Sequence, residues 1–216
     1  MTKRAAFSMA LMLASALPAY AQTQGPPLRS EDPRPMPVLD PIEGPVQPAG
    51  RRVVAAYGAC VADRSPQKAL ALLLTDFRTR EYRNGLRLLS DNNRDCFGRR
   101  GKMRSDPLLF AGAIAERLLE SGDGAIKGRL ARAAAASPAL AFSPSDELAQ
   151  CIVRAMPDDV SALFATDVGT DAETAAVRAL DIATARCGKG QQVDISAGGL
   201  RSILATAALR SVEAVK

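Results

Sequence analysis

Two pairs of cysteines with the same spacing constrain this chain most strongly. Cys60 and Cys96 lie 36 positions apart, and Cys151 and Cys187 repeat that spacing 91 positions later. Aligned at that offset without a gap, the two segments share ten identical pairs, which are Cys60/Cys151, Pro66/Pro157, Ala71/Ala162, Leu72/Leu163, Thr75/Thr166, Asp76/Asp167, Thr79/Thr170, Arg87/Arg178, Leu89/Leu180 and Cys96/Cys187. The pattern predicts an internal duplication.

The duplication selects one disulfide pairing among the three that four cysteines allow. Each bridge should lie within its own repeat, as Cys60–Cys96 and Cys151–Cys187. A bridge that closes a loop of this length stabilises the fold by roughly 4 kcal/mol in the chain-entropy model. A four-thiolate zinc site is the competing interpretation. The chain, however, has no two cysteines with only two residues between them, which is the usual spacing in such sites. We therefore expect two disulfides and no metal site.

The apolar pattern predicts an all-α fold. Alanine and leucine are abundant and aromatic residues make up only 4% of the chain, a composition that favours helix. Apolar residues recur at helical spacing in each repeat, as Tyr82, Leu86 and Leu89 do, and should face inward. Residues that favour helix starts stand at Ser65-Pro66, Thr79, Ser143-Pro144 and Thr170, the last in a capping box with Glu173. We predict two tandem repeats of about four helices, each with one disulfide, packed into one compact unit through their fourth helices. The predicted segments are a signal peptide (1–21), a proline-rich linker (22–50), helical repeat 1 (51–121), a connector (122–142) and helical repeat 2 (143–216).

The first residues indicate export. Lys3 and Arg4 precede a short apolar stretch, and Ala19-Tyr20-Ala21 has the form of a signal-peptidase site, so a cut after Ala21 is expected. A single-pass anchor is the alternative, although the stretch is shorter than the roughly 20 residues a spanning helix needs. Eight prolines follow in residues 22–50, which predicts an extended spacer or a docking segment for a partner. These features place the protein in the periplasm or outside the cell.

The two repeats differ most in charge. Residues 78–104 hold nine basic side chains against three acidic ones, whereas residues 146–194 hold nine acidic against four basic. A solvated face is the simplest interpretation of such a charge run. The sharper hypothesis is an anion-binding surface on repeat 1, formed by Arg78, Arg80, Arg83, Arg99, Arg100, Lys102 and Arg104. Its partner would be an envelope protein or an anionic envelope component, lipid or polysaccharide, and not nucleic acid. Salt-sensitive head-to-tail self-association through the oppositely charged repeats is a further alternative.

The chain lacks the residue that most enzymes use for proton transfer near neutral pH, because it contains no histidine. Catalytic triads that need histidine and histidine-ligated metal sites are therefore excluded, and we find no cofactor fingerprint. Glu116 could be a buried general acid, but we expect it to be an exposed helix residue paired with an arginine. The repeated Thr75/Thr166 and Asp76/Asp167 should satisfy helix ends, and Arg87 and Arg178 should form internal salt bridges.

These observations favour a non-catalytic envelope interaction or structural module with no catalytic residues and no cofactor. One alternative is a carrier of a lipid or other apolar ligand, which would need a large apolar pocket between the two fourth helices. Another is a histidine-free hydrolase, which would need two carboxylates facing one cleft.

Overall fold

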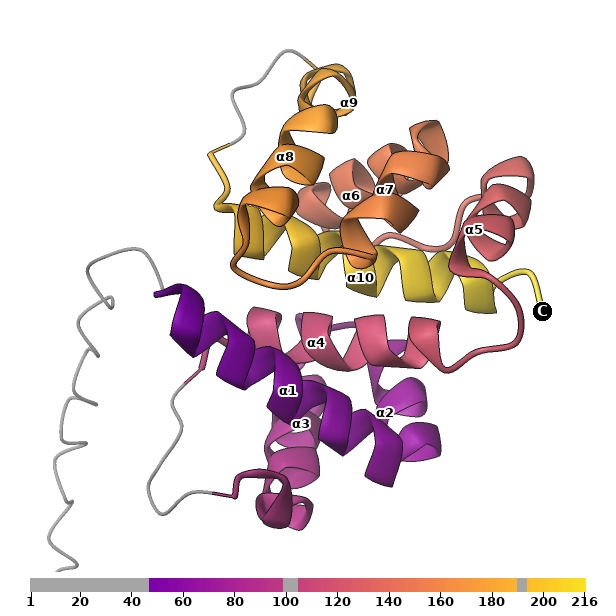
Figure 1. The fold of residues 1–216 in the computed structure, drawn as a ribbon. Helices are drawn as coiled ribbons and strands as arrows, with labels where there is room; N and C mark the ends of the chain where they lie inside the picture. Colours follow the sequence, from indigo (N-terminus) through magenta and orange to yellow (C-terminus); the bar gives the residue numbers. More distant parts are fainter. Residues whose placement is uncertain (1–46, 99–104, 190–193) are drawn as a thin grey trace, which may run out of the picture. The chain divides into compact units, whose positions relative to one another are not determined.

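The computed structural model describes residues 47–98, 105–189 and 194–216, and all regular structure in these ranges is helical. The first half of the described chain runs through α1 to α4 (Figure 1). Its elements are α1 (Pro48–Arg64), α2 (Pro66–Leu73), α3 (Arg80–Asn92), the 3₁₀ turn η1 (Arg94–Cys96) and α4 (Pro107–Glu120). The predicted all-α class is thus confirmed.

The second half contains six helices. They are α5 (Ile126–Ala135), α6 (Pro144–Ala155), α7 (Pro157–Phe164), α8 (Asp171–Ala179), α9 (Asp181–Cys187) and α10 (Ala197–Glu213). Several bounds match the first half at the offsets seen in the sequence: α7 begins and ends 91 positions after α2, and α8 begins 91 positions after α3. The tandem repeat stays a prediction, and these bounds agree with it. One difference is that α3 is continuous, whereas its counterpart is divided at Leu180 into α8 and α9.

Helix starts follow from short polar side chains and prolines. Five N-cap residues accept a backbone N–H in the first turn with their own side chains, namely Thr79, Asp106, Ser143, Thr170 and Ser196. Ser65 does not cap α2 as predicted, and instead donates its hydroxyl to Asn93 Oδ1 across 3.3 Å. The predicted linker also ends earlier than expected, because α1 begins at Pro48. Residues 1–46, which include the predicted signal peptide and most of the linker, lie outside the described residues.

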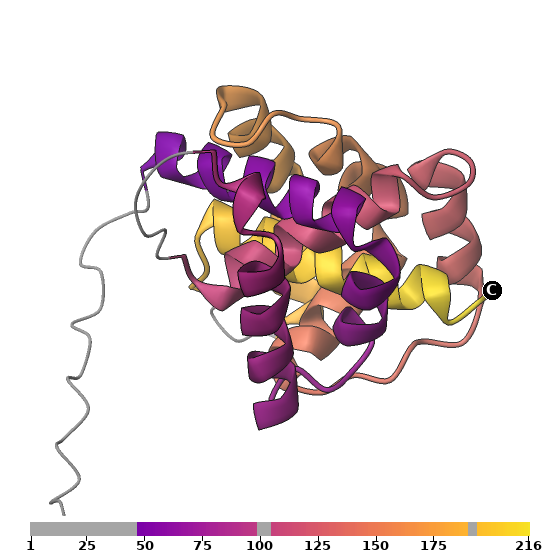
Figure 2. The same cartoon turned by 90° about the horizontal axis from the view of Figure 1, so that it is seen from below.

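The two halves meet where α4 packs against α10, as the sequence predicted (Figure 1). A Cβ atom added at Gly112 of α4 would lie 2.5 Å from Cβ of Ser202 on α10, so a side chain at this position would collide with α10. Every residue of α10 from Gly198 to Val212 is buried. Helices α5 and α6 cover α10 from the second half and α1 covers α4 from the first, and the view from below sets α1 in front of α10 (Figure 2).

Both predicted disulfides are present. Cys60 on α1 is bonded to Cys96 in η1, and Cys151 on α6 is bonded to Cys187 at the end of α9. Disulfides are typical of chains that fold in an oxidising, extracellular compartment. Among the described residues, no helix is both long and apolar enough to cross a membrane.

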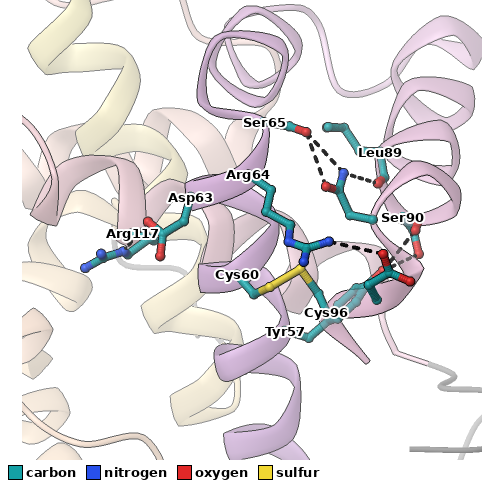
Figure 3. Close-up of a disulfide and its surroundings, with 11 residues drawn as sticks. Tyr57, Cys60, Asp63, Arg64, Ser65, Leu89, Ser90, Cys96 and Arg117 are labelled. Carbon is teal, nitrogen blue, oxygen red and sulfur yellow. Dashed lines mark hydrogen bonds and ion pairs between the residues drawn. A yellow bond between two sulfur atoms is a disulfide. The ribbon is translucent and has the colours of Figure 1, made fainter. Parts of the chain in front are cut away.

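Polar contacts beside the disulfide of the first half have no counterpart at the corresponding described positions of the second, where Leu148 replaces Tyr57. Beside Cys60–Cys96, the Tyr57 hydroxyl donates to the Ser90 carbonyl oxygen across 3.1 Å (Figure 3). Buried Asn93 donates its amide to the Leu89 carbonyl oxygen across 2.8 Å. The residue that corresponds to Asn93 in the second half is Thr184, whose buried hydroxyl has no hydrogen-bond partner among the described residues. The first half therefore has hydrogen bonds beside its disulfide, in addition to the disulfide itself.

Candidate anion-binding face and buried ion network

Helix α3 presents one buried face and one strongly basic face. The Thr79 hydroxyl begins the helix by accepting the Tyr82 N–H across 3.1 Å. Tyr82, Leu86 and Leu89 point into the core, as the sequence predicted. Burial raises the pKa of Tyr82 to about 12, so its hydroxyl stays protonated at any physiological pH.

Three arginines form a stripe along the exposed side of α3. Successive helix residues are about 100° apart around the axis, so Arg80, Arg83 and Arg87 fall within an arc of roughly 60°. All three are exposed, and none forms a salt bridge with a carboxylate among the described residues. We call these three residues the α3 arginine stripe.

The other basic residues of the predicted surface do not extend this stripe within the described chain. Arg78 lies before α3 and is held by Asp76, which accepts from its Nε and Nη2 across 3.0 and 2.8 Å. The predicted residues Arg99, Arg100, Lys102 and Arg104 lie outside the described residues. The expected salt bridge of Arg87 is not found with any described carboxylate, and the same holds for Arg178, which is also exposed.

The acidic residues of the second half are placed differently. Seven of the nine lie in the first turn of a helix, and they are Asp146, Glu147, Asp158, Asp159, Asp171, Glu173 and Asp181. Negative charge is favourable there because the partial positive charge of the helix dipole lies at the N-terminus. Two of them, Asp146 and Glu173, are buried and paired with arginine. The charge count in the sequence thus overstates the acidity of this surface.

A buried network of four charged residues joins the two halves. Glu173 of α8 is only 1% exposed and accepts from Nη1 and Nη2 of Arg51 on α1, across 2.7 and 2.6 Å. Arg201 of α10 donates to Glu173 across 3.3 Å and makes a two-pronged contact with Glu116 of α4. The Thr166 hydroxyl and carbonyl oxygens complete the shell of Arg201 at 3.0 and 2.9 Å.

The two carboxylates of this network have pKa values shifted in opposite directions. Burial raises the pKa of Glu116 above its usual value, and the shared Arg201 does not offset that effect. Burial also acts to raise the pKa of Glu173, but the hydrogen bonds from Arg51 and the Gly169 N–H, together with both arginine charges, outweigh it and lower the pKa. Glu116 therefore takes up a proton before Glu173 does as pH falls.

A second buried cluster links the halves through Arg210 of α10. Asp146 accepts a hydrogen bond from this guanidinium, which also lies over two aromatic rings. The ring centroids of Phe77 and Phe142 are 5.7 and 5.5 Å from Arg210 Cζ. Because Phe77 belongs to the first half, the charged side chain packs against both halves.

The cavity beside the buried network is too small for a substrate or a lipid. The cavity between α4 and α10, beside Glu116 and Arg201, holds only about 30 Å³. That volume fits ordered water. A larger open hollow of about 600 Å³ lies over α6 and is bordered by Gln150, Cys151 and Arg154, away from the fourth helices where a carrier pocket was expected.

Several sequence predictions can be placed in this geometry. Glu116 is paired with an arginine, as expected, but it is largely buried and not exposed, because α10 covers it. Thr75 and Thr166 donate to the carbonyl oxygens of Leu72 and Leu163, each across 2.7 Å, and so satisfy the ends of α2 and α7. Glu173 also donates its backbone N–H to the Thr170 hydroxyl, as the capping box predicts, but its two arginine partners could not be predicted because they are remote in sequence.

Within the described residues, no cluster of three or more acidic or cysteine side chains could hold a metal ion. No known protein family matches this chain, and neither does any curated protein or solved structure.

Proposed function

We propose that this protein is an exported, non-catalytic interaction module that binds an anionic partner through the α3 arginine stripe. The partner is an envelope protein or an anionic component of the envelope. The predicted signal peptide, the proline-rich segment and the two disulfides all suit a periplasmic or secreted protein.

A non-catalytic role is supported by the way the buried charges are used. Glu116 and Glu173, the two carboxylates of the network, both bind Arg201. A general acid must reach a substrate, yet the cavity beside Glu116 and Arg201 has room only for water. The network is therefore suited to joining α1, α4, α8 and α10.

The position of Arg80 is the observation that carries the proposal. Arg80 is the first residue of α3, where a positive charge opposes the helix dipole. Its counterpart 91 positions later is Asp171, the first residue of α8, where a negative charge is favourable. An exposed arginine that works against its own helix, in line with Arg83 and Arg87, is explained by a bound anion and not by stability.

The test is a native purification of the full chain at low and high salt, with co-purifying molecules identified by mass spectrometry. The variant Arg80→Ser/Arg83→Ser/Arg87→Ser is compared with Arg132→Ser/Arg178→Ser/Arg186→Ser, which removes three exposed arginines elsewhere. Both variants lose the same charge, so the comparison isolates position from net charge. N-terminal sequencing of the same wild-type sample tests the cut after Ala21.

We expect the wild type and the control variant to retain the same anionic partner at low salt and to release it at high salt, because exposed charges are screened. The stripe variant should lose that partner at low salt. Retention by the stripe variant at the wild-type level, or the absence of any salt-sensitive partner from the wild type, would refute the proposal.

A further inference from the structure

The stripe on α3 is long and narrow. The rise of about 1.5 Å per residue separates the Cα atoms of Arg80 and Arg87 by roughly 10.5 Å along the helix axis. Around the axis the three arginines cover only about 60°. On one flank lies Leu88, a large apolar side chain that is 55% exposed. The basic surface is thus as wide as a single polypeptide segment.

The residues that border the stripe make a flat anionic surface a poor fit. Asp91, which pairs with Arg94 across 2.8 Å, lies at the end of the same exposed face, and exposed Glu81 lies on the flank with Leu88. A membrane surface that met the whole exposed side of α3 would also meet both carboxylates. A narrow ligand that follows the three arginines passes Leu88 near Arg87 but stays clear of Glu81, because Glu81 and Leu88 lie seven residues apart, about 10.5 Å along the helix axis.

The spacing of the stripe matches that of another helix. Positions 80, 83 and 87 are separated by three and then four residues, which is the spacing of side chains that face a partner in helix–helix packing. Carboxylates at the same spacing on a second helix would meet the three guanidinium groups, whose planar forks suit carboxylate oxygens. Exposed Leu88 would contact an apolar side chain of that helix, which a polysaccharide does not offer.

We propose that the partner of the α3 arginine stripe is an acidic helical segment of another protein, with carboxylates at alternating spacings of three and four residues. This inference rests on the proposed function and names its partner class. A second copy of this chain does not fit, because no helix of the described residues carries three carboxylates at such spacings. In the second half, the exposed acids Glu147, Asp158, Asp171 and Asp181 stand at the starts of four separate helices.

The test measures binding of the folded wild-type chain to a labelled helical peptide of about 20 residues, long enough to form a helix in water. Its glutamates alternate at three and four positions, with one leucine beside them. A scrambled peptide of the same composition spreads the glutamates around the helix. Vesicles containing phosphatidylglycerol and soluble polygalacturonate are the probes for the two other anion classes.

We expect the patterned peptide to bind about fivefold or more tightly than the scrambled one, since orientation matters for paired charges. The stripe variant should lose about tenfold or more in affinity, whereas the Arg132/Arg178/Arg186 control should bind as the wild type does. Circular dichroism and thermal unfolding of each variant establish that it is folded.

Equal binding of the two peptides, or binding to vesicles or polygalacturonate without binding to the patterned peptide, would overturn this inference. If that happens while the stripe variant still loses its native partner, the proposed function stands and only the partner class is wrong. If the stripe variant also keeps its native partner, both fail.

Discussion

Helix α3 and its counterpart, α8 with α9, occupy corresponding places in the two halves but use charge in different ways. The first residue of α3 is Arg80, whereas the first residue of α8 is Asp171. Arg83 of the stripe corresponds to Thr174, and Arg87 corresponds to Arg178. In the second half, most of the acidic residues begin helices, and two of these form buried pairs, so they contribute to the fold. Within the described residues, the α3 arginine stripe forms no salt bridge, and only Arg83 bonds to the backbone with its side chain, by donating to the Arg78 carbonyl oxygen across 2.9 Å. This contrast supports the proposed binding role of the stripe.

The largest expected effect comes from removing a buried charge that stabilises the fold. Arg201→Ala should lower the free energy of unfolding by about 5 kcal/mol, the upper end of the range for breaking a buried ion pair, because two buried carboxylates lose a partner. Urea unfolding measures the loss. Arg80→Ser, Arg83→Ser and Arg87→Ser should each change stability by no more than about 0.5 kcal/mol. A loss below about 1 kcal/mol for Arg201→Ala would contradict the conclusion that Arg201 stabilises the fold.

Removing the disulfides one at a time compares the two halves directly. The loops have equal length, so the chain-entropy model assigns about 4 kcal/mol to each bond. We expect Cys151→Ser/Cys187→Ser to cost more than Cys60→Ser/Cys96→Ser, because Tyr57 and Asn93 continue to hold α1 near the end of α3. Thermal unfolding of both variants under the same conditions measures the difference. The opposite order would show that these polar contacts do not support the first disulfide.

The two network carboxylates should respond to pH with opposite signs. Glu173 has a lowered pKa in the folded state, so its stabilising contribution is present above the unfolded value and is lost as pH falls through the folded one. Glu116 has a raised pKa, so its contribution is present below the unfolded value and is lost as pH rises through the folded one. Relative to wild type, Glu173→Gln should therefore become less stable as pH rises from acid to neutral, and Glu116→Gln should become more stable. Unfolding curves at a series of pH values test this, and parallel pH profiles would be inconsistent with it.

The smallest effect comes from exchanging the residues that begin α3 and α8. Arg80→Asp should stabilise the protein by about 0.3–1 kcal/mol, and Asp171→Arg should destabilise it by a similar amount, because each reverses a charge at a helix N-terminus. High salt should reduce both changes. Arg80→Asp should at the same time weaken partner binding. If Arg80→Asp leaves stability and binding unchanged, the difference in charge between the first residues of α3 and α8 has no functional meaning.

Much of the fold could be predicted from local sequence. Thr79, Ser143 and Thr170 stand before their helices as caps, and Tyr82, Leu86 and Leu89 recur at helical spacing. The disulfide pairing followed from the repeated spacing of the cysteines. The basic character of the region around α3 was also visible, since it depends only on residue type.

The buried network could not be predicted, because its pairs are remote in sequence and are not repeated. After Cys187 the two copies align with one residue deleted, so that Glu116 aligns with Thr206 and Arg201 with Ala111, and the duplication carries no trace of their contact. The sequence also could not show which charges stay at the surface. Nothing in the local sequence distinguishes Asp146 and Glu173 from surface acids, yet both are buried in the folded protein.

The burial of α10 has a consequence for when the protein can fold. A nascent chain that stops before Ala197 lacks the helix that fills the space between α4, α5 and α6. The apolar faces of these helices then stay open to water, and Glu116, Glu173 and Asp146 still lack their arginine partners on α10. We therefore expect cooperative folding of the described helices only once α10 has been synthesised, a timing compatible with the proposed export.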